Sequence, residues 1–581
     1  MKYIRFIFWF LVFGGVFAFL QVRHAFHFFF VEQHQLFQNT WPYISDNLFQ
    51  PGGLAFVLSG FLVQFFLLPY MGALITALLL TLVSLFTCLI LRRIAPRIDW
   101  FVISLSPAIA LLFIQYDFNY LLSGTVAFLL MLMVLWGVLH LSDFKIRLMA
   151  HAVAVLVLFY LAGPVSLLYA SAVTVYELFG KSPGRYLVLL VLLEALAIGF
   201  GSVWFQVYPK YEFAFLPDAY YHSKMAPRFE IYYSWIGIVA LFAFALLVRN
   251  RETKGKKRYI SSGIQAVLIV ALCVWGIPKY KNEKSYMVKE LDYYCRTSQW
   301  DKILERCNGP LTNYLYMCYV NIALCEKGEL AEKAFSFDQR GLRGIIVEWN
   351  RTIAVSVLLS DIYFSVNHLA PAQEMAFEAY VGSISNGQPR MLKRLVQTNL
   401  IYGAYPVAEK YINILENTYC YKDWAKEQRK FLYNDKAVED DPLLGVKRKS
   451  LASVNTLSKL NGLDFDLMHI AEQNPAYNST IEYIGVTYLL AKDMPRFKSL
   501  VETYYGTDVL PVLPKSFQEA LITLTEAEPE QWANYRIPEE LTERFKSYKK
   551  QVLANKNNPS ALPSLLRNAF GDTYWYYFMF K

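Results

Sequence analysis

Residues 72 to 91 read GALITALLLTLVSLFTCLIL, an apolar run without a charged side chain. An α-helix rises about 1.5 Å per residue, so about 20 such residues span the hydrocarbon layer of a bilayer. Charge-free or nearly charge-free runs occur at 6 to 22, 52 to 91, 100 to 116, 118 to 142, 148 to 176, 186 to 209, 231 to 248 and 259 to 279. The pattern predicts a protein that crosses a membrane several times.

Composition divides the chain into two parts. Of its 581 residues, 55% are hydrophobic and 18% are charged, against about 25% charged in soluble domains. Disordered, collagen-like and ordinary cytosolic proteins are poor fits to these values. Residues 1 to 277 carry 19 Lys and Arg and 11 Asp and Glu, which leaves 37 and 36 of the totals of 56 and 47 for the rest. We therefore expect an all-α protein with a transmembrane helix bundle at 1–278 and a charge-balanced soluble domain at 279–581.

Basic loops predict the orientation, because short loops rich in Lys and Arg stay cytoplasmic. The clusters are Lys2 and Arg5; Arg92, Arg93 and Arg97; Lys145 and Arg147; Lys181 and Arg185; and the six basic residues from Arg249 to Arg258. With all clusters inside, the chain makes about nine crossings, or seven plus a re-entrant hairpin at 148 to 176 with Gly163-Pro164 at its tip. We expect an inner-membrane protein with a cytoplasmic N-terminus, an uncleaved first helix, and a periplasmic domain after Pro278.

The second half shows helical periodicity, and one segment resembles a tetratricopeptide repeat. In Gly403-Ala404-Tyr405-Pro406-Val407-Ala408, a small residue ends one helix, and Ala408 stands where two helices of that family cross closely. Similar turns can be placed at Ser298, Gly328, Asn367 and Lys492. The resemblance implies a helical solenoid whose concave face holds a peptide or another protein. The alternative is a non-repetitive all-helical domain.

Cysteines and the aromatic C-terminal stretch leave alternatives open. No C-x-x-C pair occurs, which disfavours zinc and thioredoxin chemistry. Buried free thiols are expected, with Cys295 and Cys307 as the best disulfide candidates because they flank the turn at Ser298. Residues 573 to 580, TYWYYFMF, either lie at the membrane interface or pack as a cap on the last repeat.

Polar residues on the predicted outer face are the candidates for chemistry. No nucleotide-binding loop, Ser-His-Asp elbow or HExxH motif occurs. The first outer loop, 23 to 51, carries Glu32 and His34, a tight turn carries Asp117, and the loop from 204 to 230 carries Asp218, His222, Lys224 and Arg228. The parity of the crossings places these three segments on one side of the membrane, as a site for a lipid-linked substrate requires.

Two further groups of polar residues have competing interpretations. Glu194 lies inside an apolar run, where an ionisable residue faces a polar cavity or is protonated and bonded to a neighbouring helix. His24, His27 and His34 are interpreted as interfacial aromatic residues, with a metal site as the alternative, because their spacing can align on one helix face. We predict no metal site.

The whole chain resembles an uncharacterised family of large bacterial envelope proteins that combine a polytopic domain with a tetratricopeptide-like tail. The segments that carry this resemblance are Glu32-Gln33-His34-Gln35-Leu36-Phe37, Gln50-Pro51-Gly52-Gly53-Leu54, Tyr160-Leu161-Ala162-Gly163-Pro164 and Thr573-Tyr574-Trp575. More distantly, residues 1 to 277 are similar to polytopic transferases that use polyprenyl-phosphate sugars. That similarity implies Glu32 as a general base, although the acidic pair common in those enzymes is Glu32-Gln33 here.

Two classes of function follow, with a transporter as a third. In the first, the protein is a non-catalytic envelope scaffold that displays its C-terminal domain to a protein or peptide partner. In the second, it is a glycosyltransferase that takes a lipid-linked sugar donor on the periplasmic face. The catalytic carboxylates would then be those of Glu32, Asp117 and Asp218. The substrate would contact His34, His222, Lys224 and Arg228. We expect contact with membrane lipid, no nucleic acid and no cofactor, and a divalent metal only if the protein is a transferase.

Overall fold

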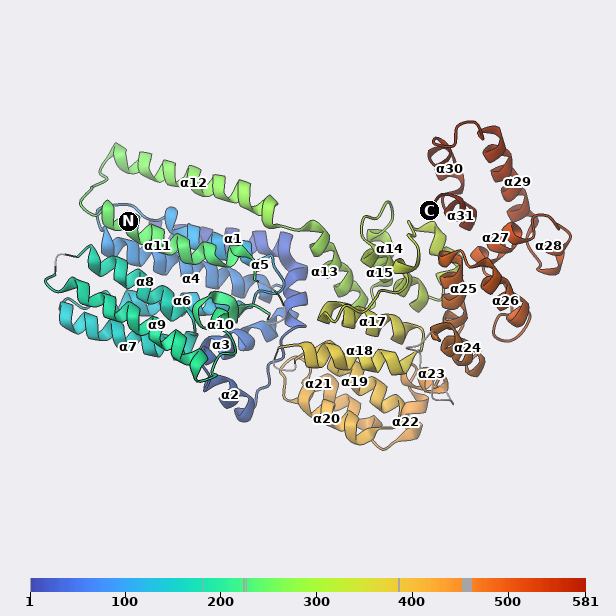
Figure 1. Ribbon diagram of the computed structural model, residues 1–581, viewed down its shortest axis with the longest axis horizontal. Helices are drawn as coiled ribbons and strands as arrows, with labels where there is room; N and C mark the ends of the chain where they lie inside the picture. The colour runs from blue at the N-terminus through green and yellow to red at the C-terminus, as the bar shows by residue number, and fades with distance from the viewer. Residues whose placement is uncertain (1, 181, 223–224, 226, 385–386, 452–461) are drawn as a thin grey trace. The chain divides into compact units, whose positions relative to one another are not determined.

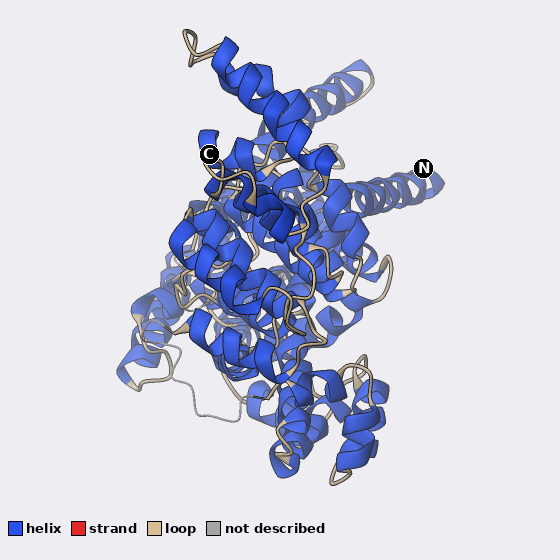
Figure 2. Ribbon diagram, turned by 90° about the vertical axis from the view of Figure 1, so that its right-hand side faces the viewer, coloured by secondary structure: helices blue, strands red, loops and turns tan. Residues whose placement is uncertain are grey.

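The computed structural model describes residues 2–180, 182–222, 225, 227–384, 387–451 and 462–581 (Figure 1). Within these ranges the secondary structure is helical and no β-strand is present (Figure 2). The chain packs as two compact units, and the first contains residues 1–286 together with 417–422. The second contains residues 287–416 and 423–581. The prediction that the protein is all-α is therefore confirmed.

Most helices of the first unit overlap the apolar runs, and two short ones, at 41–48 and 211–215, lie outside them. They are α1 (Lys2–Glu32), α2 (Trp41–Leu48), α3 (Gly53–Val63), α4 (Met71–Ile94), α5 (Ser106–Gln115), α6 (Leu122–Val138), α7 (Phe144–Ala162), α8 (Val165–Leu178), α9 (Val188–Trp204), α10 (Tyr211–Phe215), α11 (Tyr233–Leu247) and α12 (Lys256–Tyr280). Among the described residues, six helical segments are long and apolar enough to cross a membrane, by length and composition. They belong to α1, α4, α7, α9, α11 and α12.

One feature of this unit differs from the expected layout and another agrees with it. The first helix continues to Glu32, so the segment from 23 to 32 is helical and the loop begins at Gln33. The run from 148 to 176 forms two packed helices, α7 and α8, that turn at Gly163, where φ is +72°. The first arm is longer than its apolar run because Asp143 caps α7 by accepting a hydrogen bond from the Ile146 amide, which extends the helix to Phe144.

The second unit consists of shorter helices. They are α13 (Glu283–Arg296), which begins at the end of the first unit, α14 (Trp300–Arg306), α15 (Tyr314–Glu326), α16 (Leu330–Lys333), α17 (Ile353–Ser365), α18 (Leu369–Gly382), α19 (Pro389–Ile401), α20 (Tyr405–Glu416), α21 (Lys422–Gln428), α22 (Asp435–Asp440), α23 (Leu444–Lys449), α24 (Leu463–Gln473), α25 (Ser479–Ala491), α26 (Met494–Tyr504), α27 (Lys515–Leu524), α28 (Gln531–Asn534), α29 (Glu539–Ala554), α30 (Leu562–Phe570) and α31 (Tyr574–Phe580). Its core runs through α15, α17, α25, α26 and α27.

The five turns expected from the sequence all separate consecutive helices in the second unit. The residues at these turns, Ser298, Gly328, Asn367, Gly403 and Lys492, all have positive φ. In each turn, the amide of the following residue donates to the carbonyl five positions before it, as Ala404 does to Asn399 at 2.8 Å. This is the Schellman hydrogen bond, which ends a helix while satisfying its last carbonyl groups. The next helix starts two residues after each turn residue.

The aromatic C-terminal stretch packs inside the second unit as α31. Tyr574, Trp575, Tyr576 and Tyr577 are buried in two apolar clusters of this unit. The hydroxyl of Thr573 caps the helix by accepting a hydrogen bond from the Tyr576 amide. Of the two expected arrangements, the structure therefore shows the packed one.

All seven cysteines are free, and Cys295 and Cys307 form no disulfide. Cys295, Cys307, Cys318 and Cys325 are buried in the core of the second unit. Burial raises the pKa of Cys307 and of Cys325 to about 12, so these thiols stay protonated near neutral pH. The expectation of buried free thiols is confirmed for these positions.

Candidate functional site

Glu32, the last residue of α1, is hydrogen-bonded to Gln33 and Tyr421. The Tyr421 hydroxyl donates to both carboxylate oxygens of Glu32, at 2.8 and 2.9 Å. The Gln33 amide donates to that hydroxyl at 2.9 Å and to Glu32. Glu32 is 2% exposed, so its carboxylate faces these protein groups and has little contact with solvent.

Tyr421 belongs to a short segment, residues 417–422, that is part of the first unit although it lies far along the chain. Three further contacts hold this segment in place. The Asn39 amide donates to the Asn417 carbonyl at 2.6 Å, and the Cys420 thiol donates to the Gln64 carbonyl at 3.2 Å. The ring of Tyr419 lies 5.4 Å from that of Phe65. We call residues 417–422 the docking segment.

Asp117 follows α5 and is neutralised by a partner from the loop that precedes α11. Arg228 Nε lies 2.9 Å from Asp117 Oδ2, and the Tyr221 hydroxyl donates to the same carboxylate. The Asn119 amide donates to Asp117 Oδ1 at 3.0 Å, which shapes the turn itself. Asp117 is 3% exposed, so the carboxylate of this ion pair is buried.

Backbone pairing joins the Asp117 turn to the loop that carries His222. The Leu121 amide donates to the Tyr220 carbonyl at 2.6 Å, and the His222 amide donates to the Asn119 carbonyl at 2.9 Å. The ring of Phe118 lies 5.7 Å from that of Phe30, two residues before Glu32 on α1. The structure therefore brings parts of the three segments that carry the sequence-predicted residues into contact.

The other predicted residues have different surroundings. His34 Nδ1 lies 2.8 Å from the Phe30 carbonyl oxygen, and His222 is buried. Asp218 is buried, and burial together with nearby Glu212 raises the pKa of its carboxyl against the effect of Lys210. Lys224 lies outside the described residues.

Two further expectations concern Glu194, inside an apolar run, and the interfacial histidines. Glu194 is half-buried on α9. The rings of His24 and His27 lie 4.2 Å apart, and His24 also meets Tyr116 at 5.0 Å. Among the described residues, no group of three or more His, Cys, Asp or Glu side chains is placed to hold a metal ion.

The helical hairpin formed by α7 and α8 contains a buried polar cluster that sequence reasoning missed. Arg147 Nη2 donates to Glu177 Oε2 at 3.0 Å, and His151 Nε2 lies 3.6 Å from Glu177 Oε1. His151 Nδ1 lies 2.8 Å from the Tyr169 hydroxyl. His151 and Glu177 stand at nearly equal distances in sequence from the Gly163-Pro164 tip, and this spacing is a signal that could have paired them.

Comparison with known proteins places the chain in a family. A family model described as a family of unknown function (DUF6057) matches residues 1–581. The chain belongs to this DUF6057 family. No curated protein and no solved structure matches it. The DUF6057 match covers both compact units, including Glu32 and the docking segment.

Proposed function

We propose that this DUF6057 protein is a multi-pass inner-membrane scaffold of the bacterial envelope. Its first unit spans the membrane with the N-terminus in the cytoplasm, and its second unit lies in the periplasm. There the helical repeats present a surface to a protein or peptide partner. The six long apolar helices support insertion into a bilayer, where a helix satisfies its own backbone hydrogen bonds.

The observation that carries the scaffold function is the pairing of Glu32 with Tyr421. A general base must reach the proton that it removes. Both carboxylate oxygens of Glu32 instead accept hydrogen bonds from a tyrosine of the docking segment. Asp117, the second candidate acid, is paired with Arg228. These acids have the contacts of residues that hold segments of the chain together.

Covalent connectivity adds to this argument. The chain passes between the two units at 286–287, 416–417 and 422–423. The docking segment lies between α20 and the main part of α21 in sequence and belongs to the first unit, so the chain enters that unit a second time. This second entry supports a structural role for Tyr421 and for Glu32, because both belong to the contacts that hold the docking segment within the first unit.

The alternative is a glycosyltransferase that uses a polyprenyl-phosphate sugar, and Asp218 is the observation that favours it. Its carboxyl is buried, and its side chain has no hydrogen bond or ion pair with any described residue. A raised carboxyl pKa suits a general acid or base near neutral pH. In this alternative, His34, His222, Lys224 and Arg228 would contact the donor, and a divalent metal could assist.

Two substitutions separate these functions. Tyr421→Phe removes the hydroxyl that is hydrogen-bonded to both Glu32 and Gln33. These two buried side chains lose that partner, which lowers the stability of the contact by about 1 to 3 kcal/mol. We therefore expect Cys420, whose pKa burial raises to about 11, to react roughly tenfold faster or more with a maleimide, measured by peptide mass spectrometry. Tyr419→Phe is the matched control, because Tyr419 is exposed on the same segment.

Glu32→Gln tests the transferase directly. Loss of a general base lowers the rate by about 100-fold or more, so a transferase variant should fail to complement a deletion strain at matched protein level. If the protein is a scaffold, the Glu32→Gln variant should complement the deletion strain fully, because the glutamine oxygen still accepts a hydrogen bond from the Tyr421 hydroxyl. Failure of Glu32→Gln together with unchanged Cys420 labelling in Tyr421→Phe contradicts the scaffold function.

A further inference from the structure

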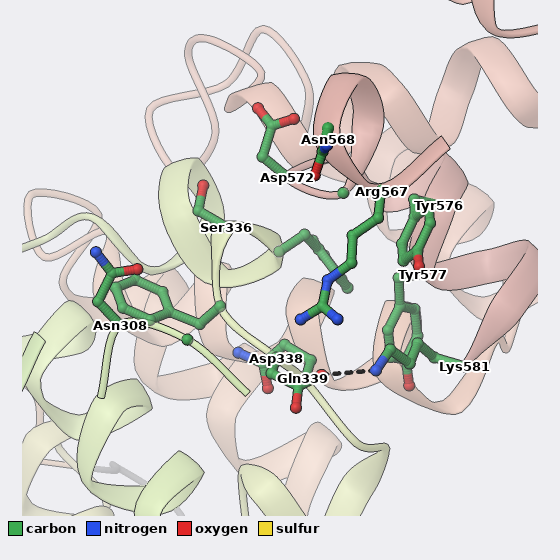
Figure 3. A pocket seen from close by; sticks show the side chains of 14 residues that line it. Asn308, Ser336, Asp338, Gln339, Arg567, Asn568, Asp572, Tyr576, Tyr577 and Lys581 are labelled. Carbon is green, nitrogen blue, oxygen red and sulfur yellow. Dashed lines mark hydrogen bonds and ion pairs between the residues drawn. The ribbon is translucent and has the colours of Figure 1, made fainter. Parts of the chain in front are cut away.

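The second unit contains a polar pocket of about 300 Å³ (Figure 3). One wall is formed by residues 308–309 and 335–339, which follow α14 and α16. The other wall is formed by α30, α31 and the turn between them. The pocket therefore joins parts of the chain more than two hundred residues apart.

The first of its two acids, Asp338, is fully engaged by neighbouring donors. Lys581 Nζ donates to Asp338 Oδ1 at 2.6 Å, and Arg340 Nη2 donates to Oδ2 at 2.9 Å. The Leu311 amide donates to Oδ2 at 3.0 Å. Burial acts to raise the pKa of this carboxyl, but these contacts hold it down at about 2. Asp338 is thus ionised and already paired with two cations.

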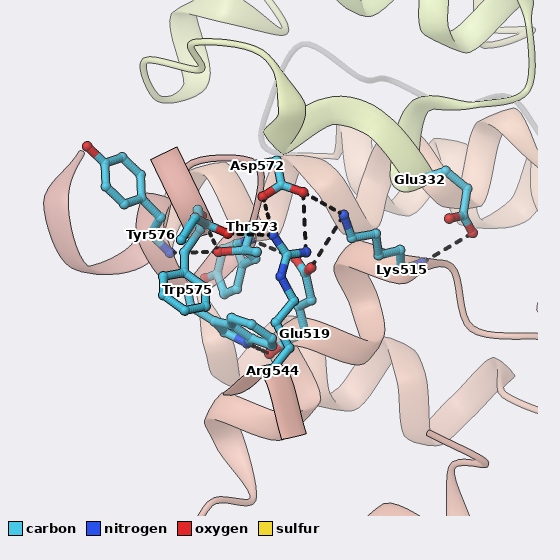
Figure 4. A network of polar contacts seen from close by, with 11 residues as sticks. Glu332, Lys515, Glu519, Arg544, Asp572, Thr573, Trp575 and Tyr576 are labelled. Carbon is cyan, nitrogen blue, oxygen red and sulfur yellow. Dashed lines mark hydrogen bonds and ion pairs between the residues drawn. The ribbon is translucent and has the colours of Figure 1, made fainter. Parts of the chain in front are cut away.

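The second acid, Asp572, is engaged in the same way (Figure 4). Arg544 Nη2 donates to Asp572 Oδ1 at 2.6 Å, and Lys515 Nζ donates to Oδ2 at 3.1 Å. Burial acts to raise the pKa of Asp572, and these two cations lower it below its ordinary value. The two acids of the pocket therefore hold four cations between them.

Arg567 adds a fifth cation and has no internal partner. It projects from α30 into the space between the two walls (Figure 3). Among the described residues, no carboxylate or carbonyl accepts a hydrogen bond from its guanidinium group. The side chains of Asn308, Ser336 and Asn568, which also line the pocket, likewise have no hydrogen-bond partner among the described residues.

We propose that this pocket binds a small oxyanion, a carboxylate or phosphate group, with Arg567 as its main contact. The planar guanidinium presents paired N–H donors that match the oxygens of either group, and such charge-assisted hydrogen bonds are among the strong ones. The amide N–H groups of Asn308 and Asn568 and the Ser336 hydroxyl supply further donors. Because both acids are already compensated, an incoming anion meets a net positive site.

The site is independent of the proposed scaffold function and gives the second unit a ligand of its own. An oxyanion bound in the pocket would connect α30 to the segment after α16. A ligand that binds only the folded protein also raises its stability by mass action. The same titration can therefore be read by heat release and by thermal stability.

The test uses the full-length protein in detergent and titrates it near neutral pH with sodium phosphate and, separately, with sodium succinate. Sodium chloride at matched ionic strength controls for screening of surface charges. We expect saturable binding of one or both anions, weakened about tenfold or more by Arg567→Gln, since a charge-assisted contact is lost. Asn568→Asp, which adds a negative charge without changing size, should weaken binding as well.

Arg351→Gln is the matched control, because Arg351 is exposed and lies outside the pocket. Binding of phosphate alone identifies a phosphate-bearing ligand, and binding of succinate alone identifies a carboxylate. The proposal is overturned if neither anion binds at about 20 mM, or if Arg567→Gln binds as tightly as the wild type. Equal weakening by Arg351→Gln also overturns it, because the anion would then respond to general surface charge.

Discussion

Glu519 shows how a single buried residue positions the C-terminal helix. It lies on α27 and is 1% exposed. Its carboxylate accepts a hydrogen bond from the Tyr574 amide at 2.7 Å, and its backbone carbonyl accepts one from the Trp575 indole at 2.8 Å (Figure 4). Burial, opposed by the Tyr574 amide and by Lys515, raises the pKa of Glu519 to about 7.

This raised pKa predicts a dependence of stability on pH. Between about pH 4.5 and 7 the folded protein keeps a proton on Glu519 that the unfolded chain releases. The stability that this group contributes is therefore complete at low pH and is lost as pH rises toward about 7. Glu519→Gln cannot ionise, so at pH near 8 it should be more stable than the wild type by up to about 3 kcal/mol.

The measurement is urea unfolding of the full-length chain with pulse proteolysis of the second unit, at pH near 5 and near 8. The two proteins should have similar free energies of unfolding near pH 5. Glu540→Gln is the control, because Glu540 is exposed in the same unit and should show no such difference. If Glu519→Gln and the wild type have equal free energies of unfolding near pH 8, the pKa of Glu519 is not raised and the prediction is wrong.

At the scale of the element, a recurrent helix end organises the second unit. Five helices end in a Schellman turn, and three of the five turn residues are Ser298, Asn367 and Lys492 rather than glycine. A non-glycine residue in this conformation costs about 1 kcal/mol or more, so packing around the turn must favour it. Asn367 shows one such reason, because its side chain accepts a hydrogen bond from the buried ammonium of Lys447 at 2.9 Å.

Ala408 tests the packing of one such helix pair. It lies on α20, which packs against α19, and it is 0% exposed. Ala408→Leu adds volume where none is free and should lower the free energy of unfolding by about 1 to 3 kcal/mol. Val407→Leu is the control, because Val407 is 43% exposed on the same helix. Equal unfolding midpoints in urea for the two variants would contradict close packing at Ala408.

At the scale of the whole molecule, the orientation of the first unit is a prediction from its basic loops. Six basic residues lie between Arg249 and Arg258, and short loops of this kind stay in the cytoplasm. Cysteine placed at Ser142, in the exposed loop before α7, should label with a membrane-impermeant reagent only after the inner membrane is permeabilised. Cysteine placed at Ser560, exposed in the second unit, should label once the outer membrane alone is opened.

The wild-type protein provides the background for this labelling, because its own cysteines are buried or half-buried. The reverse pattern, with Ser142→Cys accessible from the periplasm and Ser560→Cys protected, would invert the proposed orientation. Labelling of both positions from the same side would instead mean that the number of crossings between them is even.

Local sequence was sufficient for the long apolar helices of the first unit and for five helix ends of the second. Apolar runs predicted the long helices of the first unit, because burying a continuous apolar helix needs no information from distant residues. Gly163-Pro164 predicted the hairpin tip, and small or polar residues predicted the five turns, because φ is restricted by sterics within one residue. The length of α1 was underestimated, since aromatic residues and histidines after Arg23 continue the helix.

Contacts between distant residues depended on the tertiary structure. Nothing near Tyr421 indicates that its hydroxyl bonds to Glu32, and nothing near Arg228 indicates its pairing with Asp117. The aromatic tail had two equally suitable environments, an interface or a core, because apolar burial is not directional. A sequence pattern reports which side chains must leave water. Which partners they meet is decided only when the whole chain packs, because hydrogen bonds and ion pairs require specific geometry between residues far apart in sequence.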